Sequence, residues 1–183
     1  MIFKKSTNIK QFIELSNFYD MTSTIEEISK MDIPKFIGKY EVTETLDSIT
    51  FGQRIDLEEM KDDNDFFFKP LEIIVGLKKE QIIFLKASDV IRFGQFVVSE
   101  LKRFNDRDLQ TLKYKFDKEE IEAGIKEINH GIFGTIDMIA KRMNISHDAV
   151  LELSQAKVYM MLKIDIDNAN YQKNLRDIFK NKQ

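Results

Sequence analysis

The side chains that usually carry out catalysis are scarce in this chain. Its 183 residues include no Cys and two His, His130 and His147. The absence of Cys excludes a thiol nucleophile, a disulfide and a thiolate zinc site. We interpret His130, which precedes Gly131, as a helix C-cap residue, and His147 as a residue of a first helical turn. Neither has a carboxylate three or four residues further on that could complete a metal-binding pair.

Motifs for phosphate binding, acyl transfer and calcium binding are also missing. Gly131-x-x-Gly134 lacks the Lys and the preceding strand of a P-loop, and no G-x-S-x-G sequence occurs. The acidic segment 56–65 (DLEEMKDDND) has neither the sixth-position Gly nor the terminal Glu of an EF-hand loop. We interpret this segment as a solvated surface. We therefore expect a protein that is not an enzyme and that holds no metal and no cofactor.

The composition predicts the fold class. Only two Pro and seven Gly occur, and long stretches are rich in Leu, Ile, Lys and Glu, which favours helices over an all-β fold. We predict a mainly α protein: a compact multi-helix domain with a helix-turn-helix-like C-terminal unit and little or no sheet. A polar stretch predicts a connection, 105–116, between an N-terminal helical part, 1–104, and a C-terminal helical part, 117–183. The length also suits one single domain.

Several local signals predict where elements begin and end. Ser23 and Glu26 match a capping box and predict the start of a helix. Segment 36–55 mixes strand-like alternation with helical spacing, and we favour a helix there. The remaining signals are a helix start at Pro70 with a stop at Gly76, an amphipathic helix from Ser88 to about Phe104, and a capping box formed by Asp117 and Glu120.

The sharpest pattern is the segment 136–155 (IDMIAKRMNISHDAVLELSQ), which is typical of two helices joined by a tight turn. Ala140 suits the close approach of the two helices, and Asn144 suits a left-handed turn position. If the unit bound DNA, the contacts would come from residues in and after the first helix. These candidates are Lys141, Arg142, Ser146 and His147. Asp148 and Glu152 lie on the same outward face and would repel phosphate, so a packing unit is the favoured interpretation.

The helix predicted after the turn, from Ser146 to about Ile164, has almost no polar face, and we expect 169–179 to continue it as a terminal helical stretch. A helix that is apolar all round must be covered on all sides, either by the core of its own chain or by a partner. The candidate partner-binding residues are Leu151, Val158, Met161 and Leu162.

The charge and hydropathy of the chain indicate which partners and which cellular environment to expect. A formal net charge of −3 and a pI near 5.6 give no overall basic field for nucleic acid. No run approaches 18 apolar residues, and the first ten residues lack a signal-peptide core. We expect a soluble protein made in the cytosol, without membrane association.

Four stretches taken in order resemble phage tail assembly chaperones and related virion-morphogenesis proteins. They are TFGQRIDLEEM, PLEIIVGL, FLKASDVIRFGQFVVSELKRF and the long C-terminal stretch that begins GIFGTIDMIAKRM. The resemblance covers residues 40 to 180. It implies a small helical unit that docks onto partner proteins during tail building, and it carries over no catalytic residue.

The leading hypothesis is a non-enzymatic phage assembly or virion protein located in the host cytoplasm or the virion. Its partners would be other phage structural or tail proteins, or copies of itself. Two alternatives stay open: a ring or connector structural subunit of a virion, and a helix-turn-helix DNA-binding regulator. As a partner of this chain, nucleic acid is expected less than another protein.

Overall fold

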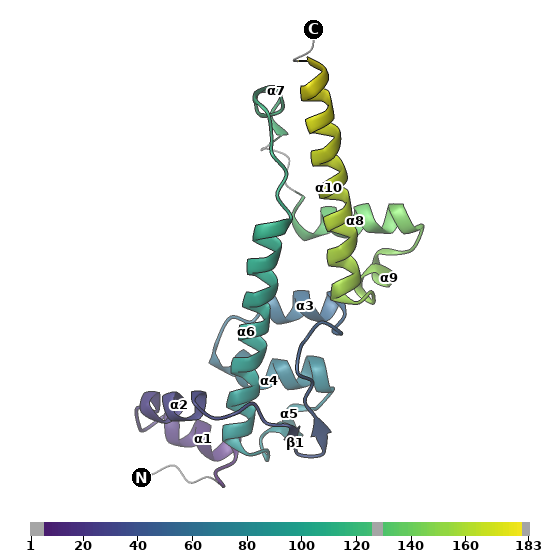
Figure 1. Ribbon diagram of the computed structural model, residues 1–183. Coiled ribbons are helices and arrows are strands. Elements are labelled where there is room, and N and C mark those ends of the chain that lie inside the picture. The colour runs from purple at the N-terminus through teal and green to yellow at the C-terminus, as the bar shows by residue number, and fades with distance from the viewer. Residues whose placement is uncertain (1–5, 126–129, 181–183) are drawn as a thin grey trace. The chain divides into compact units, whose positions relative to one another are not determined.

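The computed structural model describes residues 6–125 and 130–180 (Figure 1). Helices take up 67% of the structure, which confirms the predicted mainly α fold class. The chain divides into two compact units. Unit 1 is the chain up to Ile49 together with Gln53–Arg103, and unit 2 is Thr50–Gly52 together with the chain from Phe104 onward.

The helices of the N-terminal half are α1 (Ile9–Ser16), α2 (Thr22–Ser29), α3 (Phe51–Glu58), α4 (Asp63–Pro70), the π-helix η1 (Leu71–Val75), α5 (Lys79–Ile82) and α6 (Ala87–Thr111). Strands β1 (Phe36–Ile37) and β2 (Tyr40–Glu41) lie between α2 and α3. The C-terminal half contains α7 (Lys118–Glu122), α8 (Gly131–Met143), α9 (His147–Leu151) and α10 (Gln155–Lys180).

The core of unit 1 forms around α1 and α6. The amide of Ile9 donates to the Leu85 carbonyl, and the amide of Ala87 donates to the Thr7 carbonyl, each over 2.9 Å. These bonds hold the start of α1 beside the start of α6, where Phe12 is buried. The other largest buried side chains of unit 1 include Leu46, Leu57, Leu71, Ile82, Ile91 and Phe93.

The predicted start of α2 is wrong. The helix begins at Thr22, so Ser23 lies inside it and does not form a capping box with Glu26. Asp20 takes the capping role, because its Oδ1 accepts from the Thr22 amide at 2.9 Å and from the Thr22 hydroxyl at 2.6 Å. A side chain two residues before the helix thus satisfies an amide that has no partner within the helix.

The helix favoured over 36–55 is also wrong for most of that range. Residues 36–41 form an antiparallel hairpin that pairs Ile37 with Tyr40, and α3 begins only at Phe51. Gly38, with φ of 60°, supplies the left-handed turn that joins the two short strands. The strand-like alternation was the correct signal in the first part of the segment.

Around Pro70 the order of elements differs from the prediction. Pro70 ends α4, which begins earlier because Asp62 accepts from the Asp65 amide at 2.9 Å. The following turn is the π-helix η1. Gly76 ends it at φ of 74°, as predicted for this glycine.

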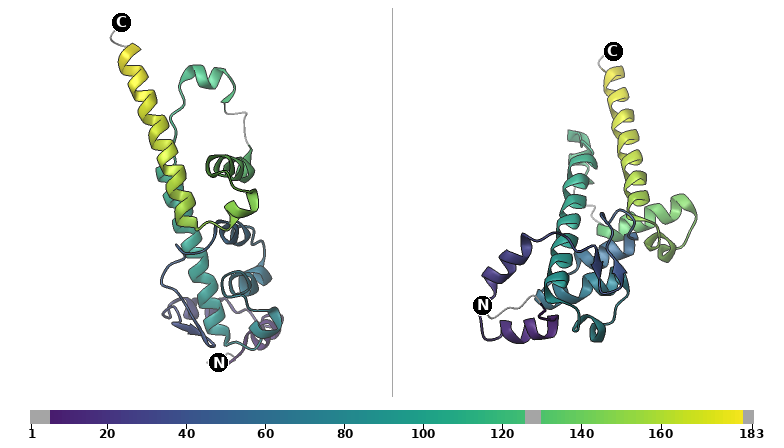
Figure 2. Two further views of the ribbon diagram at one scale, coloured as in Figure 1. Left: turned by 90° about the vertical axis from the view of Figure 1, so that its right-hand side faces the viewer. Right: turned by 60° about the horizontal axis from the view of Figure 1, so that its bottom comes forward.

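The longer helices also depart from their predicted bounds. α6 continues to Thr111, inside the range 105–116 that the sequence assigned to a connection. The capping box of Asp117 and Glu120 is confirmed, although α7 ends at Glu122. The single helix predicted from Ser146 is broken after α9, because the Leu153 carbonyl accepts from the Phe51 amide at 2.8 Å. α10 then runs without interruption through the terminal helical stretch (Figure 2).

Candidate partner-binding surface

The predicted helix–turn–helix geometry is present in unit 2. Asn144 ends α8 at φ of 52° and ψ of 50°, and the Ser146 hydroxyl accepts from the Ala149 amide at the start of α9. Ala140 is buried, as expected for the close approach of the two helices, and the neighbouring Ile139 is buried too. Short polar residues thus define both ends of the turn, because each satisfies a local backbone requirement.

The four candidate DNA-contacting residues all have partners within the chain. Lys141 Nζ lies 2.6 Å from an Asp137 carboxylate oxygen, and His147 Nε2 lies 3.4 Å from the other. Lys141, with His147 adding to it, holds the pKa of the Asp137 carboxyl below its usual range. Arg142 NH1 pairs with the Asp165 carboxylate of α10 at 2.7 Å, and Ser146 caps α9. Each basic side chain is therefore already opposed by a carboxylate, which weakens the field available to DNA phosphates.

One face of α10 contacts the last turns of α6 and the segment that follows it. The Arg107 guanidinium carbon lies 3.6 Å from the centre of the Tyr159 ring, whose hydroxyl lies 3.2 Å from the Thr111 hydroxyl. Further along, the Asn170 side-chain amide donates to the Lys113 carbonyl at 2.9 Å.

Lys173 continues this contact towards the C-terminus. Its ammonium donates to the Lys115 carbonyl and lies 3.5 Å from both the Asp117 and the Glu120 carboxylates. The side chain of Lys173 is only 11% exposed. Glu120 also accepts from the Tyr114 hydroxyl at 2.7 Å, and this bond raises the pKa of Tyr114. The face of α10 that carries Tyr159, Asn170 and Lys173 is therefore occupied by the chain itself.

The candidate partner-binding residues lie at different depths. Val158 is 1% exposed, so the chain already covers it. Leu151 lies against Gly52, where an added Cβ would be 3.2 Å from the Leu151 Cβ. Met161 and Leu162 are half-buried. The structure therefore brings Leu151 and Val158 into the packing of unit 2, and leaves Met161 and Leu162 partly accessible.

The strongly exposed apolar side chains of α10 are ones that the sequence analysis did not select. Ile164, Tyr171 and Ile178 are 44, 61 and 51% exposed, and Met160 and Phe179 are 52 and 61% exposed. Met160, Ile164, Tyr171 and Ile178 recur at intervals of four and seven residues, which places them along one side of the helix, and Phe179 directly follows Ile178. This spacing was visible in the sequence. Only the structure showed that this side of α10 is uncovered and that the side carrying Tyr159 is covered.

A second exposed apolar group lies at the start of α8. Ile132 and Phe133 are 48 and 59% exposed. The Phe133 ring meets the His147 ring edge-on, with centroids 5.2 Å apart, so α9 holds it in one orientation. An aromatic ring fixed on a short helix loses little conformational freedom when a partner covers it.

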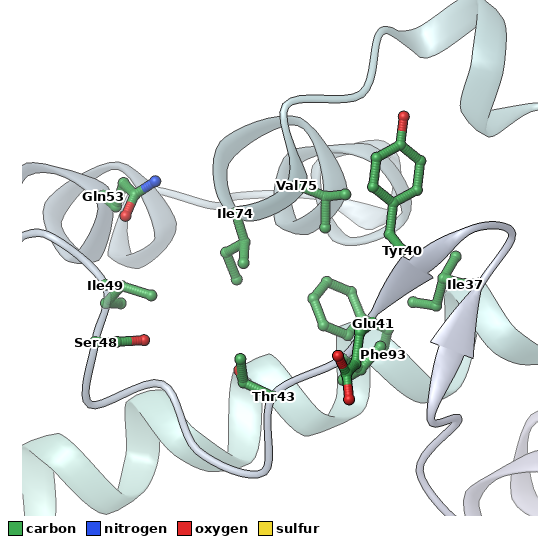
Figure 3. A pocket seen from close by; sticks show the side chains of 11 residues that line it. Ile37, Tyr40, Glu41, Thr43, Ser48, Ile49, Gln53, Ile74, Val75 and Phe93 are labelled. Carbon is green, nitrogen blue, oxygen red and sulfur yellow. The ribbon is translucent and has the colours of Figure 1, made fainter.

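Unit 1 contains a cavity of ≈ 380 Å³ beside the hairpin. Figure 3 shows Ile49, Ile74 and Phe93 directed towards its middle, with Thr43, Ser48 and Glu41 along one side. Glu41 is the single carboxylate among the described residues that line it, and none of these is a His or a Lys. Apart from Glu41, the titratable group among these lining residues is the Tyr40 phenol, so the lining holds no carboxylate–His or carboxylate–Lys pair.

Within residues 6–125 and 130–180, no group of three or more His, Asp or Glu side chains is placed to hold a metal ion. In the same part of the chain, no helix combines the length and apolar character needed to cross a bilayer.

Comparisons with protein-family models, with curated proteins and with solved structures found no match to this chain.

Proposed function

We propose that this protein is a non-enzymatic assembly protein that binds partner subunits through the apolar side chains that unit 2 leaves exposed. The observation that carries the proposal is the exposure of large apolar side chains on two helices of one small unit: Ile132 and Phe133 on α8, and Ile164, Tyr171 and Ile178 on α10. Single exposed apolar residues are ordinary on protein surfaces, whereas groups of them are typical of protein–protein interfaces.

The chemistry of these side chains fits a protein partner better than a small ligand or a nucleic acid. Phe133 and Tyr171 are aromatic, and aromatic anchors contribute much of the binding energy at interfaces. Exposed carboxylates nearby, such as Asp148 and Glu152, would orient an approaching partner and raise its association rate. The resemblance in sequence supports a partner among phage structural or tail proteins, met in the host cytoplasm or the virion.

The experiment is co-purification of the tagged full-length protein from phage-infected cells, followed by identification of bound proteins. We expect other phage structural or tail proteins in the eluate. Phe133→Ser should reduce their recovery, because it removes an exposed aromatic anchor from unit 2. Phe18→Ser is the matched control, because it removes a more exposed aromatic, at 81%, from unit 1.

The outcomes separate the proposal from its alternatives. Equal recovery by the wild type and the Phe133 variant would contradict a docking role for α8. Recovery of further copies of the chain alone would favour a ring or connector subunit. Recovery of duplex DNA in place of protein would favour a regulator, for which the paired state of Lys141 and Arg142 gives no support.

A further inference from the structure

The uncovered side of α10 carries a regular repeat. Its members are separated alternately by three and four residues, which is the spacing of the a and d positions of a coiled coil. We call these residues the α10 seam: Met161, Ile164, Asn168, Tyr171, Leu175 and Ile178. Met161, Asn168 and Leu175 occupy a positions, and Ile164, Tyr171 and Ile178 occupy d positions.

The seam lies opposite the face that the chain itself uses. At about 100° per residue, Tyr159, Asn170 and Lys173 fall on the other side of the helix from the seam. Those three residues hold α10 against the last turns of α6 and the segment that follows it. The three seam residues at d positions are between 44 and 61% exposed, Asn168 is also exposed, and Met161 and Leu175 are half-buried. α10 is therefore held as a formed helix on one side, while the d positions and Asn168 of its heptad repeat are exposed on the other.

We propose that the α10 seam binds the same seam of a second copy of this chain, as a parallel two-stranded coiled coil. This inference rests on the proposed function for the role of unit 2 in binding, and it names the occupant of α10. The apolar group on α8 then remains available for a different partner.

A second copy fits the seam because the repeat is complementary to itself. Ile164, Tyr171, Leu175 and Ile178 would each meet their own equivalent in apolar layers. Asn168 would meet Asn168 of the second copy, where each side-chain amide can donate to the other's carbonyl. A single Asn at an a position is a known determinant of register and of a defined number of strands.

The position of Asn168 favours the parallel direction. In a parallel pair, Asn168 faces Asn168 of the second copy in one layer. In the antiparallel register that aligns all six seam residues, Asn168 faces Tyr171, so the two amides no longer meet. The flanking Asp167 carboxylate is paired with Lys163 of its own chain and does not set the direction.

The helix is already formed before association, and this compensates for the short length of the seam. From Met161 to Ile178 the seam is about 26 Å long. Isolated helices of this length are marginal in water, because the ordering cost must be met on association. Here the contacts of Tyr159, Asn170 and Lys173 have already ordered the helix, so association has less conformational entropy to overcome. We expect a dimer that dissociates on dilution.

The absence of Cys allows a direct test of the pairing and its direction. Leu175→Cys places a thiol at an a position, where a parallel dimer brings two equivalent thiols together. Asp177→Cys is the matched control, an exposed position two residues away that lies outside the seam. Under mild oxidation of the full-length protein, Leu175→Cys should form a disulfide-linked dimer about tenfold faster or more, because association raises the effective thiol concentration.

Equal rates for the two variants would overturn the proposal. So would rapid cross-linking between an Ile164→Cys chain and a Leu175→Cys chain without cross-linking of Leu175→Cys to itself, which is the antiparallel result.

Light scattering across a range of concentrations gives a second test. The wild type should shift from monomer to dimer as concentration rises, whereas Tyr171→Glu should stay monomeric with an unchanged circular dichroism spectrum, because Tyr171 is 61% exposed. A wild type that is monomeric throughout, yet still captures phage proteins, would overturn the dimer and leave the proposed function standing. A dimer that captures no phage protein would support the α10 pairing and contradict the proposed function.

Discussion

Glu100 is a carboxylate whose removal should destabilise unit 1 measurably. It lies on α6 with its side chain 11% exposed. Its Oε2 accepts from the buried Leu46 amide at 2.9 Å. Its two oxygens also accept from Arg103, each over 2.8 Å, and Arg103 in turn donates to Asp47. Glu100 thus joins α6 to the loop that precedes α3.

The expected cost of Glu100→Ala follows from these contacts. The Leu46 amide would remain buried without its acceptor, which costs about 1–3 kcal/mol. Loss of the pair with Arg103 adds only about 0–1 kcal/mol, because that guanidinium is partly exposed. The helix propensity of Ala differs from that of Glu by only a few tenths of a kcal/mol. We expect a loss of about 2–3 kcal/mol, or about 4–12 °C in melting temperature if the whole chain melts together.

The same network predicts a pH dependence. The hydrogen bonds from Arg103 hold the pKa of Glu100 below its ordinary value of 4.5. Because the carboxylate is stabilised in the folded state, it contributes stability above about pH 4.5, and this contribution is lost as the pH falls through the lower folded-state pKa. Glu100→Gln keeps an acceptor for the Leu46 amide but removes the charge. We therefore expect it to cost less than Glu100→Ala at pH 7.

Urea unfolding at pH 7 and at pH 3, followed by circular dichroism, measures these effects. The free-energy difference between the wild type and Glu100→Gln should shrink towards zero at the lower pH, where the wild-type carboxyl becomes protonated. A Glu100→Ala variant as stable as the wild type at pH 7 would refute the assigned role of Glu100. A difference for Glu100→Gln that does not change with pH would refute the role of its charge.

Three other outcomes are expected. Gly94→Ala should lower the free energy of unfolding in urea by about 1 kcal/mol. The new Cβ would lie 2.8 Å from the Phe66 ring and 3.0 Å from the Phe66 backbone carbonyl oxygen, and this crowding outweighs the gain in helix propensity. A stabilised variant would contradict this packing. Asn144→Ala should lower the free energy of unfolding by about 1 kcal/mol, whereas Asn144→Gly should lower it little, because φ at this position is 52°. Equal melting temperatures for the two variants would show that the left-handed turn is not retained. Gel-shift assays at physiological salt should show no sequence-specific duplex complex, and a complex lost on Lys141→Ala and Arg142→Ala would reverse the ranking of partners.

Local chemistry in the sequence was enough to locate several element boundaries. Asp117 and Glu120 form the predicted capping box, Gly76 ends its helix, and Asn144 takes the left-handed turn. In each case one side chain, or the lack of one, satisfies a backbone requirement within a few residues. Such requirements do not depend on the rest of the fold, so the sequence alone determines them.

Two of the errors arose where a distant part of the chain decides the outcome, whereas at α2 and α4 a neighbouring Asp, Asp20 or Asp62, starts the helix instead of the predicted residue. The helix predicted from Ser146 is broken because the Leu153 carbonyl bonds to the Phe51 amide, about a hundred positions earlier in the chain. The only local signal is Ser154, whose hydroxyl accepts from the Lys157 amide at 3.3 Å at the start of α10; the bond to Phe51 cannot be read from the local sequence. Segment 36–55 likewise becomes a hairpin and a loop, since the Leu46 amide is held by Glu100 from α6.

Both the sequence and the tertiary structure were needed to identify the candidate surface. The alternation of three and four residues along 161–178 is written in the sequence and fixes which side chains share one side of a helix. Which side is covered is a tertiary matter. Arg107 packs on Tyr159 and the Lys115 carbonyl accepts from Lys173, so one side of α10 is occupied and the side that carries Ile164, Tyr171 and Ile178 is left exposed. The sequence therefore determined the amphipathic pattern of α10. The packing of 107–120 against α10 decided which part of that pattern faces solvent, because burial depends on neighbours that are far away in the chain.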